Sequence, residues 1–231
     1  MKYLRYFLTV FLLSILALQA FFFLQIFSWR WINPDSTAFQ RAERHRLCGW
    51  SIPYLQKCEV QHEWVEFKKI SPFLKRAIII SEDSDFYRHS GFELQAMKEA
   101  WDRNQKNSQH LRGGSTITQQ LAKNLFLSGE KNYARKGQEF LITVMLEVAL
   151  PKERIFEIYL NSVEWGEGVF GVGAATAHYF SLKPSQLSME EAASLAAALP
   201  APKCYDNIKY CSKARVNFPA RMDFILERMN K

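Results

Sequence analysis

The strongest constraint on this chain is an N-terminal stretch, from Phe7 to Phe27, that contains no charged residue. Its polar interruptions are limited to Thr9, Ser14, Gln19 and Gln25. A helix that crosses the hydrocarbon core of a membrane needs roughly 20 mostly apolar residues, which is the length found here. The sequence therefore predicts one N-terminal transmembrane helix.

This stretch differs from a signal peptide that is removed after export. Such a peptide has an apolar core of about 7 to 15 residues and small residues at the cleavage site. Here the one candidate, Ala20, has Leu18 two positions before it and Phe21 directly after it. We therefore expect an uncleaved signal anchor, with cleavage as the alternative. Trp29 and Trp31 would then lie in the membrane interface.

The four cysteines indicate which side of the membrane the rest of the chain occupies. Basic residues flank the apolar stretch on both sides, so charge alone does not decide the orientation. We expect the disulfides Cys48–Cys58 and Cys204–Cys211, because short separations keep the sulfurs close, although four cysteines allow three connectivities. Two local disulfides favour an oxidising compartment outside the cytoplasm, and four buried free thiols are the alternative.

The net charge of +7 at pH 7 indicates an anionic partner, which could be nucleic acid, anionic lipid headgroups or a phosphorylated substrate. We expect no nucleic acid, because the sequence has no arginine-rich run and no aromatic RNA-binding motif. The five scattered histidines include no pair at metal-ligand spacing on a helix. The sequence therefore predicts no metal site built from protein ligands.

After the anchor, residues 31–70 mix proline, charge and aromatic side chains without clear periodicity and predict a membrane-proximal connector. From Ser71 onward the apolar spacing is helical. We expect one helix capped by Ser71, one capped by Ser115, and one with a capping box of Ser188 and Glu191. Further helices are expected over 92–106, 133–150 and 152–160. The chain should therefore be a mainly α fold with one catalytic unit.

Five sequence blocks follow one another in this helical region. They read SEDSDFYRHSG at 81–91, GGSTITQQLAKNLFL at 113–127, RKGQE at 135–139, KERIFEIYLN at 152–161 and GEGVFGVGAATAHYF at 166–180. In this order and at these distances they resemble the blocks of peptidoglycan glycosyltransferases, in particular the monofunctional biosynthetic transglycosylases. The resemblance covers nearly everything from residue 65 to 201. Two positions depart from the family pattern, Ser81 and Ser181, and neither carries the expected chemistry.

The resemblance implies a lysozyme-like, two-lobed catalytic domain at residues 71–231, after a cytoplasmic tail and anchor at 1–30 and a connector at 31–70. Family members polymerise lipid II, a disaccharide linked to undecaprenyl pyrophosphate, into β-1,4-linked glycan strands, with inversion at the anomeric carbon and release of undecaprenyl pyrophosphate. The expected location is the inner membrane, with the catalytic domain on the periplasmic side. The expected partners are lipid II, the growing lipid-linked glycan, and cell-wall synthesis or division proteins.

Glu82 corresponds to the family's catalytic base, which must take the proton of a poorly nucleophilic sugar hydroxyl. Its neighbour Asp83 is expected at the substrate site. There it either raises the proton affinity of Glu82 by like-charge repulsion or binds backbone donors and organises the turn. Phe86 should pack in the core, and His89 should hold the turn before Gly91 by hydrogen bonds.

The second block is expected to bind substrate. By pattern alone it is an ordinary amphipathic helix, with Ile117, Leu121 and Leu125 on its apolar side. The resemblance instead places its polar side in the substrate cleft, with Lys123 facing phosphate. Glycines allow a close approach to a ligand, and the N-terminal amides of a helix suit anions. The expected substrate-binding residues of this block are Gly114, Ser115, Thr116, Gln119, Gln120 and Lys123.

Glu139 corresponds to the family's second catalytic carboxylate. It follows Lys136 by three positions and Arg135 by four, so the three side chains can share one helix edge. Ion pairs at this spacing are also common on protein surfaces. The resemblance implies that all three act near the substrate pyrophosphate, or near a Mg²⁺ or Mn²⁺ ion bound to it.

Two other functions are compatible with parts of the sequence. A lysozyme-like enzyme could cleave glycans, but cleavage requires an acid that protonates a sugar leaving group, whereas this chain offers cations suited to pyrophosphate. An anchored scaffold for cell-wall proteins could keep the motifs without activity, although Glu82, Lys123 and Glu139 are all intact. Incubation with lipid-linked disaccharide separates the three, because polymer, cleavage products or no reaction would result.

Overall fold

The computed structural model describes residues 2–49, 60–93, 98, 114–130, 132–207, 209, 211 and 217–231. Its helices in these ranges are α1 (Lys2–Ser28), α2 (Ala38–Cys48), α3 (Pro72–Glu82), α5 (Ile117–Phe126), α6 (Tyr133–Ala149), α7 (Lys152–Ser162), α8 (Gly171–Phe180), α9 (Met189–Ala198), α10 (Pro202–Asp206) and α11 (Phe218–Met229). Short strands β1 (Gln61–His62), β2 (Glu164–Gly166) and β3 (Val169–Phe170) and the 3-10 turns η1 (Phe67–Lys69) and η2 (Pro184–Gln186) accompany them. The prediction of a mainly α fold with an N-terminal apolar helix is confirmed.

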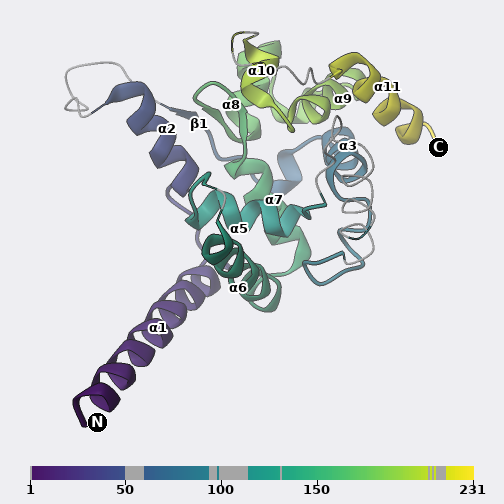
Figure 1. Cartoon of the computed structure of the whole chain (residues 1–231). Helices are drawn as coiled ribbons and strands as arrows, with labels where there is room; N and C mark the ends of the chain where they lie inside the picture. The colour runs from purple at the N-terminus through teal and green to yellow at the C-terminus, as the bar shows by residue number, and fades with distance from the viewer. Residues whose placement is uncertain are drawn as a thin grey trace.

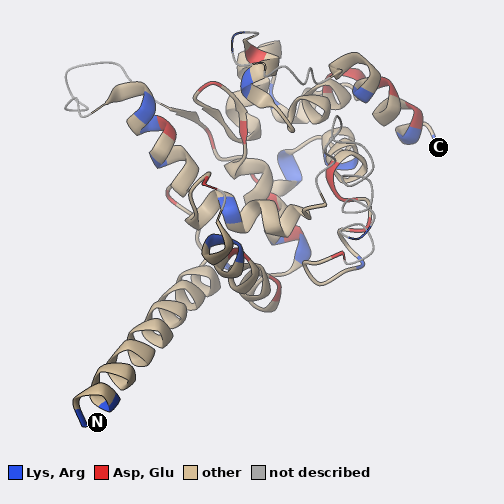
Figure 2. Cartoon of the chain, viewed as in Figure 1, with Lys and Arg blue, Asp and Glu red and all other residues tan. Residues whose placement is uncertain are grey.

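Helix α1 extends away from the rest of the molecule and carries the N-terminus at its far end (Figure 1). Its charged residues lie only near that end (Figure 2). Within the described residues, α1 is the one helix that is long and apolar enough to cross a membrane. Most of its apolar side chains are exposed, as expected for a helix that is hydrophobic on all sides and faces lipid.

Helix α3 carries the first sequence block. Ser71 caps its N-terminus, and Pro72 occupies the first turn, where no helical partner exists for an amide proton. Leu74 and Ile78 are fully buried, and the helix packs against α9 and α11. The helix ends at Glu82, so this side chain stands at the junction between the packed helix and the following loop.

Helix α5 begins later than the sequence predicted, because Thr116 rather than Ser115 is its N-cap. The Thr116 hydroxyl accepts a hydrogen bond from the Gln119 amide at 3.2 Å, and the Gln119 side chain accepts one from the Thr116 amide at 3.0 Å. This capping box satisfies two backbone donors that have no partner within the helix. Ile117 and Leu121 are fully buried, and α5 packs against α6 and α7.

Part of the predicted connector belongs to the folded domain. Strand β1 pairs in parallel with β3, and β3 pairs antiparallel with β2. The side-chain amide of Asn161, on α7, bonds both backbone groups of the buried Val65. Helix α2 also lies in this segment, with a capping box of Thr37 and Gln40. The sequence analysis missed these elements because a two-residue strand and a largely polar helix produce no hydrophobic periodicity.

The other predicted helices correspond to α6, α7 and α9, and the capping box of Ser188 with Glu191 begins α9. Helix α8 starts at Gly171, where φ is +76° and an added Cβ would lie 2.7 Å from the Asn161 carbonyl oxygen. A side chain is therefore excluded at this position. The helix predicted over 92–106 lies outside the described residues, apart from positions 92, 93 and 98.

Candidate active site

Glu82 is held at the end of α3 with 10% of its side chain exposed. One carboxylate oxygen accepts hydrogen bonds from the Ser81 hydroxyl at 3.1 Å and from Arg221 Nη2 at 2.8 Å. The other oxygen accepts one from Gln120 Nε2 at 3.0 Å. Because a carboxylate oxygen has two lone pairs, this second oxygen keeps capacity for another donor. The arrangement makes Glu82 an oriented, partly accessible proton acceptor.

Gln120 is itself oriented by Tyr159 of α7, whose hydroxyl donates to Gln120 Oε1 at 2.9 Å. Tyr159 is fully buried. This burial, reinforced by the negative charges of Glu82 and Asp83, raises the pKa of the Tyr159 hydroxyl well above its ordinary value. Tyr159 therefore remains a proton donor and keeps the amide group of Gln120 directed at Glu82.

Arg221 of α11 is a site residue that the sequence analysis missed. Its Nη2 donates to Glu82 and also to the Ser81 hydroxyl at 2.8 Å and the Ser81 carbonyl at 3.1 Å. The sequence contained a sign of this role. Arg221 precedes the buried Ile225 and Met229 by one and two helical turns, so all three lie on the same face of α11. A cation on an apolar face indicates a buried partner, but only the fold identifies Glu82, 139 positions away.

Asp83 has a different environment from its neighbour Glu82. Its side chain is buried and accepts hydrogen bonds from the Ile117 amide at 2.9 Å and from His89 Nε2 at 2.8 Å. The other ring nitrogen of His89 accepts from the Gly91 amide at 3.1 Å. Of the two roles expected for Asp83, the contacts match the organisation of the turn. The first amide of α5 is therefore occupied by Asp83 and is not open to an anionic substrate.

Thr116 and Gln119 of the second block are also buried. The Thr116 hydroxyl donates to the Gly91 carbonyl at 2.7 Å, and Gln119 completes the capping box of α5. The side chains of Asp83, Thr116 and Gln119 join the loop after α3 to the start of α5, and their expected contact with substrate stays a prediction. The residue spacing placed Gln119 on the polar side of the helix but could not show that this position faces the protein interior.

The other predicted substrate-binding residues of this block, Gly114, Ser115, Gln120 and Lys123, are partly exposed. Gly114 and Ser115 precede α5, and their contact with substrate stays a prediction. Lys123 lies one turn after Gln120 on α5, and its Nζ is 5.3 Å from the ring centre of Phe39 on α2. The polar edge of α5 therefore consists of Gln120 and Lys123.

Glu139 on α6 is a buried acid between two cations. Arg135 Nη1 lies 2.8 Å from one carboxylate oxygen, and Lys136 Nζ contacts the other. The predicted helix edge is therefore present. Because a buried charge requires compensation, Glu139 holds both basic groups in a fixed position and leaves the cluster with a net positive charge.

Arg135 and Arg221 share a further property. In each, the Nε atom is buried and has no hydrogen-bond partner within the described part of the chain. Leaving a buried donor unsatisfied costs roughly 1 to 3 kcal/mol. Guanidinium groups match the geometry of carboxylate and phosphate oxygens. Both atoms are therefore candidate donors to a bound ligand, one near Glu82 and one near Glu139.

The donor set around Glu139 does not fit a divalent metal ion held by the protein. Both of its oxygens already face cations, whereas Mg²⁺ requires oxygen ligands in a nearly ideal octahedral arrangement. Across the described residues, no group of three or more His, Cys, Asp or Glu side chains could hold a metal ion.

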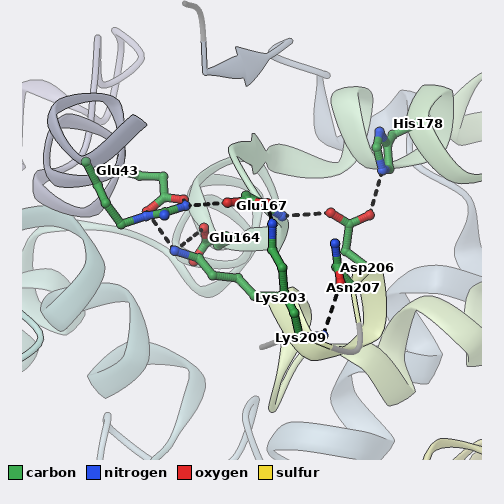
Figure 3. A network of polar contacts seen from close by, with 9 residues as sticks. Glu43, Glu164, Glu167, His178, Lys203, Asp206, Asn207 and Lys209 are labelled. Atoms are coloured by element: carbon green, nitrogen blue, oxygen red, sulfur yellow. Dashed lines mark hydrogen bonds and ion pairs between the residues drawn. The ribbon is translucent and has the colours of Figure 1, made fainter. Parts of the chain in front are cut away.

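A second charged cluster joins α2, β2 and the turn that follows it, α8 and α10 (Figure 3). Lys203 Nζ lies 2.6 Å from a Glu43 oxygen and 3.2 Å from a Glu164 oxygen. Burial raises the pKa of Glu164 to about 7, although Lys203 opposes the shift. For Glu43, burial also acts to raise the pKa, but hydrogen bonds and charges from Arg46 and Lys203 outweigh it and lower the pKa.

The predicted C-terminal disulfide lies beside this cluster. Cys204 and Cys211 are bonded to each other, and Asp206 between them pairs with His178 at 2.9 Å. Cys48 is also disulfide-bonded, and its predicted partner Cys58 lies outside the described residues. The disulfide thus fixes the end of α10, whose charged side chains contact α8 and the β2–β3 region.

Residues 52–230 match the family model described as "Transglycosylase". A "Biosynthetic peptidoglycan transglycosylase" of Cupriavidus metallidurans is 57% identical to this chain over 229 residues, which cover 99% of the chain and 97% of the relative. The proteins of the same description from Ralstonia nicotianae and Herminiimonas arsenicoxydans are 55% and 48% identical, each over 99% of the chain and 97% and 95% of the relatives.

Proposed function

Because the chain belongs to the transglycosylase family of peptidoglycan glycosyltransferases, we propose that it polymerises lipid II into β-1,4-linked glycan strands. The C4 hydroxyl of one lipid-linked disaccharide attacks the anomeric carbon of the growing chain, which inverts, and undecaprenyl pyrophosphate leaves. The observation that carries the proposal is the oriented carboxylate of Glu82 together with a separate cation cluster around Glu139.

Glu82 acts as the general base. As the C4 oxygen forms its bond to the anomeric carbon, its proton passes to the Glu82 oxygen that retains a free lone pair. Gln120 and Arg221 hold the carboxylate by hydrogen bonds from α5 and α11, so little reorientation is needed when the acceptor binds. The buried Nε of Arg221 is available to a sugar oxygen of the acceptor.

Arg135 and Lys136 stabilise the leaving group. The bond between the anomeric carbon and the pyrophosphate oxygen breaks with both electrons going to that oxygen, so negative charge grows on the pyrophosphate. Glu139 holds the two cations in place, and Arg135 Nε can donate to a phosphate oxygen. Lys123 supplies a further positive charge on the edge of α5. A Mg²⁺ or Mn²⁺ ion carried by the pyrophosphate would reduce the same charge.

The location follows from the substrate and from α1. A lipid-linked sugar stays in the membrane, so the enzyme gains from an anchor that keeps its domain at the surface. The apolar α1 supports an uncleaved inner-membrane anchor. The disulfides support a catalytic domain on the periplasmic side, where thiols are oxidised. Proteins of cell-wall synthesis or division are the partners expected there.

The test compares Glu82→Gln and Glu139→Gln in full-length protein supplied with lipid II. Glu82→Gln keeps the size of the side chain but removes proton acceptance, so turnover should fall by roughly 10²- to 10⁴-fold while substrate binding survives. Glu139→Gln should lower turnover through the leaving group, with a defect that changes with magnesium concentration and grows when Lys123 is also replaced.

The exposed carboxylate Glu66 supplies the matched control, because Glu66→Gln removes a surface charge without touching either cluster. Near wild-type polymerisation by Glu82→Gln would show that another group is the base. Cleavage products of lipid II without any polymer would identify a cleaving enzyme, and a folded wild-type protein without any turnover would leave the scaffold function.

A further inference from the structure

We infer that α1 is a positioning element of the active site, and that Gln19 and Gln138 form the contact through which it holds α6. This inference rests on the proposed function, in which α1 lies in the membrane and α6 carries the cations for the leaving group. Gln138 directly precedes Glu139, so a contact at Gln138 fixes the rotation and height of the helix turn that holds Arg135 and Lys136.

The two side chains form a reciprocal amide pair. Gln19 Nε2 donates to Gln138 Oε1 at 3.0 Å, and Gln138 Nε2 donates to Gln19 Oε1 at 3.0 Å. The two residues are 119 positions apart, and α1 and α6 pack side by side. Inside a membrane little water is available to replace these hydrogen bonds. Pairing of the two amide groups is therefore favoured over their separation.

Other contacts make the end of α1 part of the domain. Ile26 is fully buried, and Trp29 stacks on Phe126 at the end of α5, with ring centres 5.3 Å apart. Arg154 of α7 donates to the carbonyl oxygens of Trp29 and Ile32 at 2.8 and 2.7 Å. These carbonyls lie just beyond the last turn of α1, where a cation is favourable. The anchor is therefore docked onto α5 and α7 as well as α6.

The position of Gln19 sets the depth of α6. It lies nine residues before Ser28, which at about 1.5 Å per residue is about 14 Å from the end of the helix. Arg135, Lys136 and Glu139 lie within one turn of Gln138, and charged side chains are costly in hydrocarbon, so the amide pair lies towards the headgroup end of the core that α1 spans. After Gln138, helix α6 has an exposed apolar face, like the exposed apolar side chains of α1. Its members are Phe140, Leu141, Val144 and Val148.

This depth suits the chemistry assigned to α6. The pyrophosphate of the lipid-linked sugar is tied to a polyprenyl chain in the membrane and cannot rise far above the headgroups. A domain connected only by a flexible linker would let Arg135 and Lys136 move relative to that level. The amide pair instead couples both cations to the membrane helix, so the cluster stays where the leaving group resides.

The experiment uses full-length protein in phospholipid vesicles, with the variants Gln19→Leu, Gln138→Leu and the double variant. Ser14→Leu is the matched control, because it also replaces a polar side chain of α1, and among the described residues the Ser14 hydroxyl bonds only the Val10 carbonyl of the same helix. Hydrogen exchange of the α6 amides, measured by mass spectrometry, reports docking independently of activity. Polymerisation of lipid II yields kcat and KM separately.

Each single variant should speed exchange in the first turns of α6 and lower kcat about 3- to 30-fold with a smaller change in KM. The double variant should be no worse than the poorer single one, because both changes remove the same pair. Ser14→Leu should match the wild type in both measurements. Exchange and kcat that stay unchanged in Gln19→Leu, a change in only one of them, or additive losses in the double variant overturn the inference. Absence of polymerisation by the wild type refutes the proposed function, while the exchange data still report whether α1 holds α6.

Discussion

Replacing Glu164 by glutamine should remove a loss of stability that the wild-type protein shows as pH rises. Burial raises the pKa of Glu164 from 4.5 to about 7. The folded state therefore keeps this proton to a higher pH than the unfolded state does. The stabilisation from this group is fully present below pH 4.5 and is lost as pH rises through 7.

The size of the effect follows from the difference between the two pKa values. The difference between a pKa of 4.5 in the unfolded chain and about 7 in the folded one corresponds to about 3 kcal/mol. Between pH 5 and pH 8 the wild type should lose about 2 to 3 kcal/mol of this. Glu164→Gln stays neutral, so its free energy of unfolding relative to wild type should rise by about that amount over the same range. For a chain of this size the change amounts to about 5–10 °C in Tm.

Denaturation of both proteins in detergent, from pH 5 to pH 8, measures this difference and cancels the titration of groups common to both. Lys203, Glu43 and Arg46 face the same carboxylate and remain in the variant. The exposed Glu66→Gln should follow the wild-type profile. A stability difference between Glu164→Gln and wild type that stays constant with pH would refute the reasoning, because the buried carboxylate would then not gain a proton on folding.

Three further predictions concern the site, the disulfides and the anchor. Arg221→Ala should lower the kcat of steady-state polymerisation about 10- to 100-fold, and Arg221→Lys should lower it less. An unchanged kcat would show that Arg221 does not position Glu82 for catalysis. Replacing Cys204 and Cys211 by serine should lower the free energy of unfolding by about 2 to 3 kcal/mol in urea, and non-reducing peptide mapping should recover the pairs Cys204–Cys211 and Cys48–Cys58. The protein should stay in membranes through high salt and alkaline washing with its N-terminus intact, and a processed soluble form beginning after Ala20 would contradict the anchor.

The order and type of most helices could be predicted because their signals are local. Ser71 followed by Pro72, and Ser188 followed by Glu191, mark helix starts within one turn. The start of α5 was wrong by one residue, since Ser115 and Thr116 both have hydroxyls that can cap a helix. Which of them does so depends on Gly91, whose carbonyl accepts the Thr116 hydroxyl and fixes that side chain.

The sequence by itself determined the apolar N-terminal helix, the mainly helical fold, the pairing of Glu139 with Arg135 and Lys136, and the disulfide between Cys204 and Cys211. Each of these depends on residues within one helical turn, one short loop or one continuous run. Only the tertiary structure separated the adjacent acids Glu82 and Asp83. Asp83 accepts a hydrogen bond from the Ile117 amide, 34 positions away. Glu82 accepts one from Arg221, 139 positions away, and keeps a carboxylate oxygen with a free lone pair. Adjacent residues differ in this way because their side chains contact different parts of the fold. The sequence pattern does not show which helices will pack around each of them.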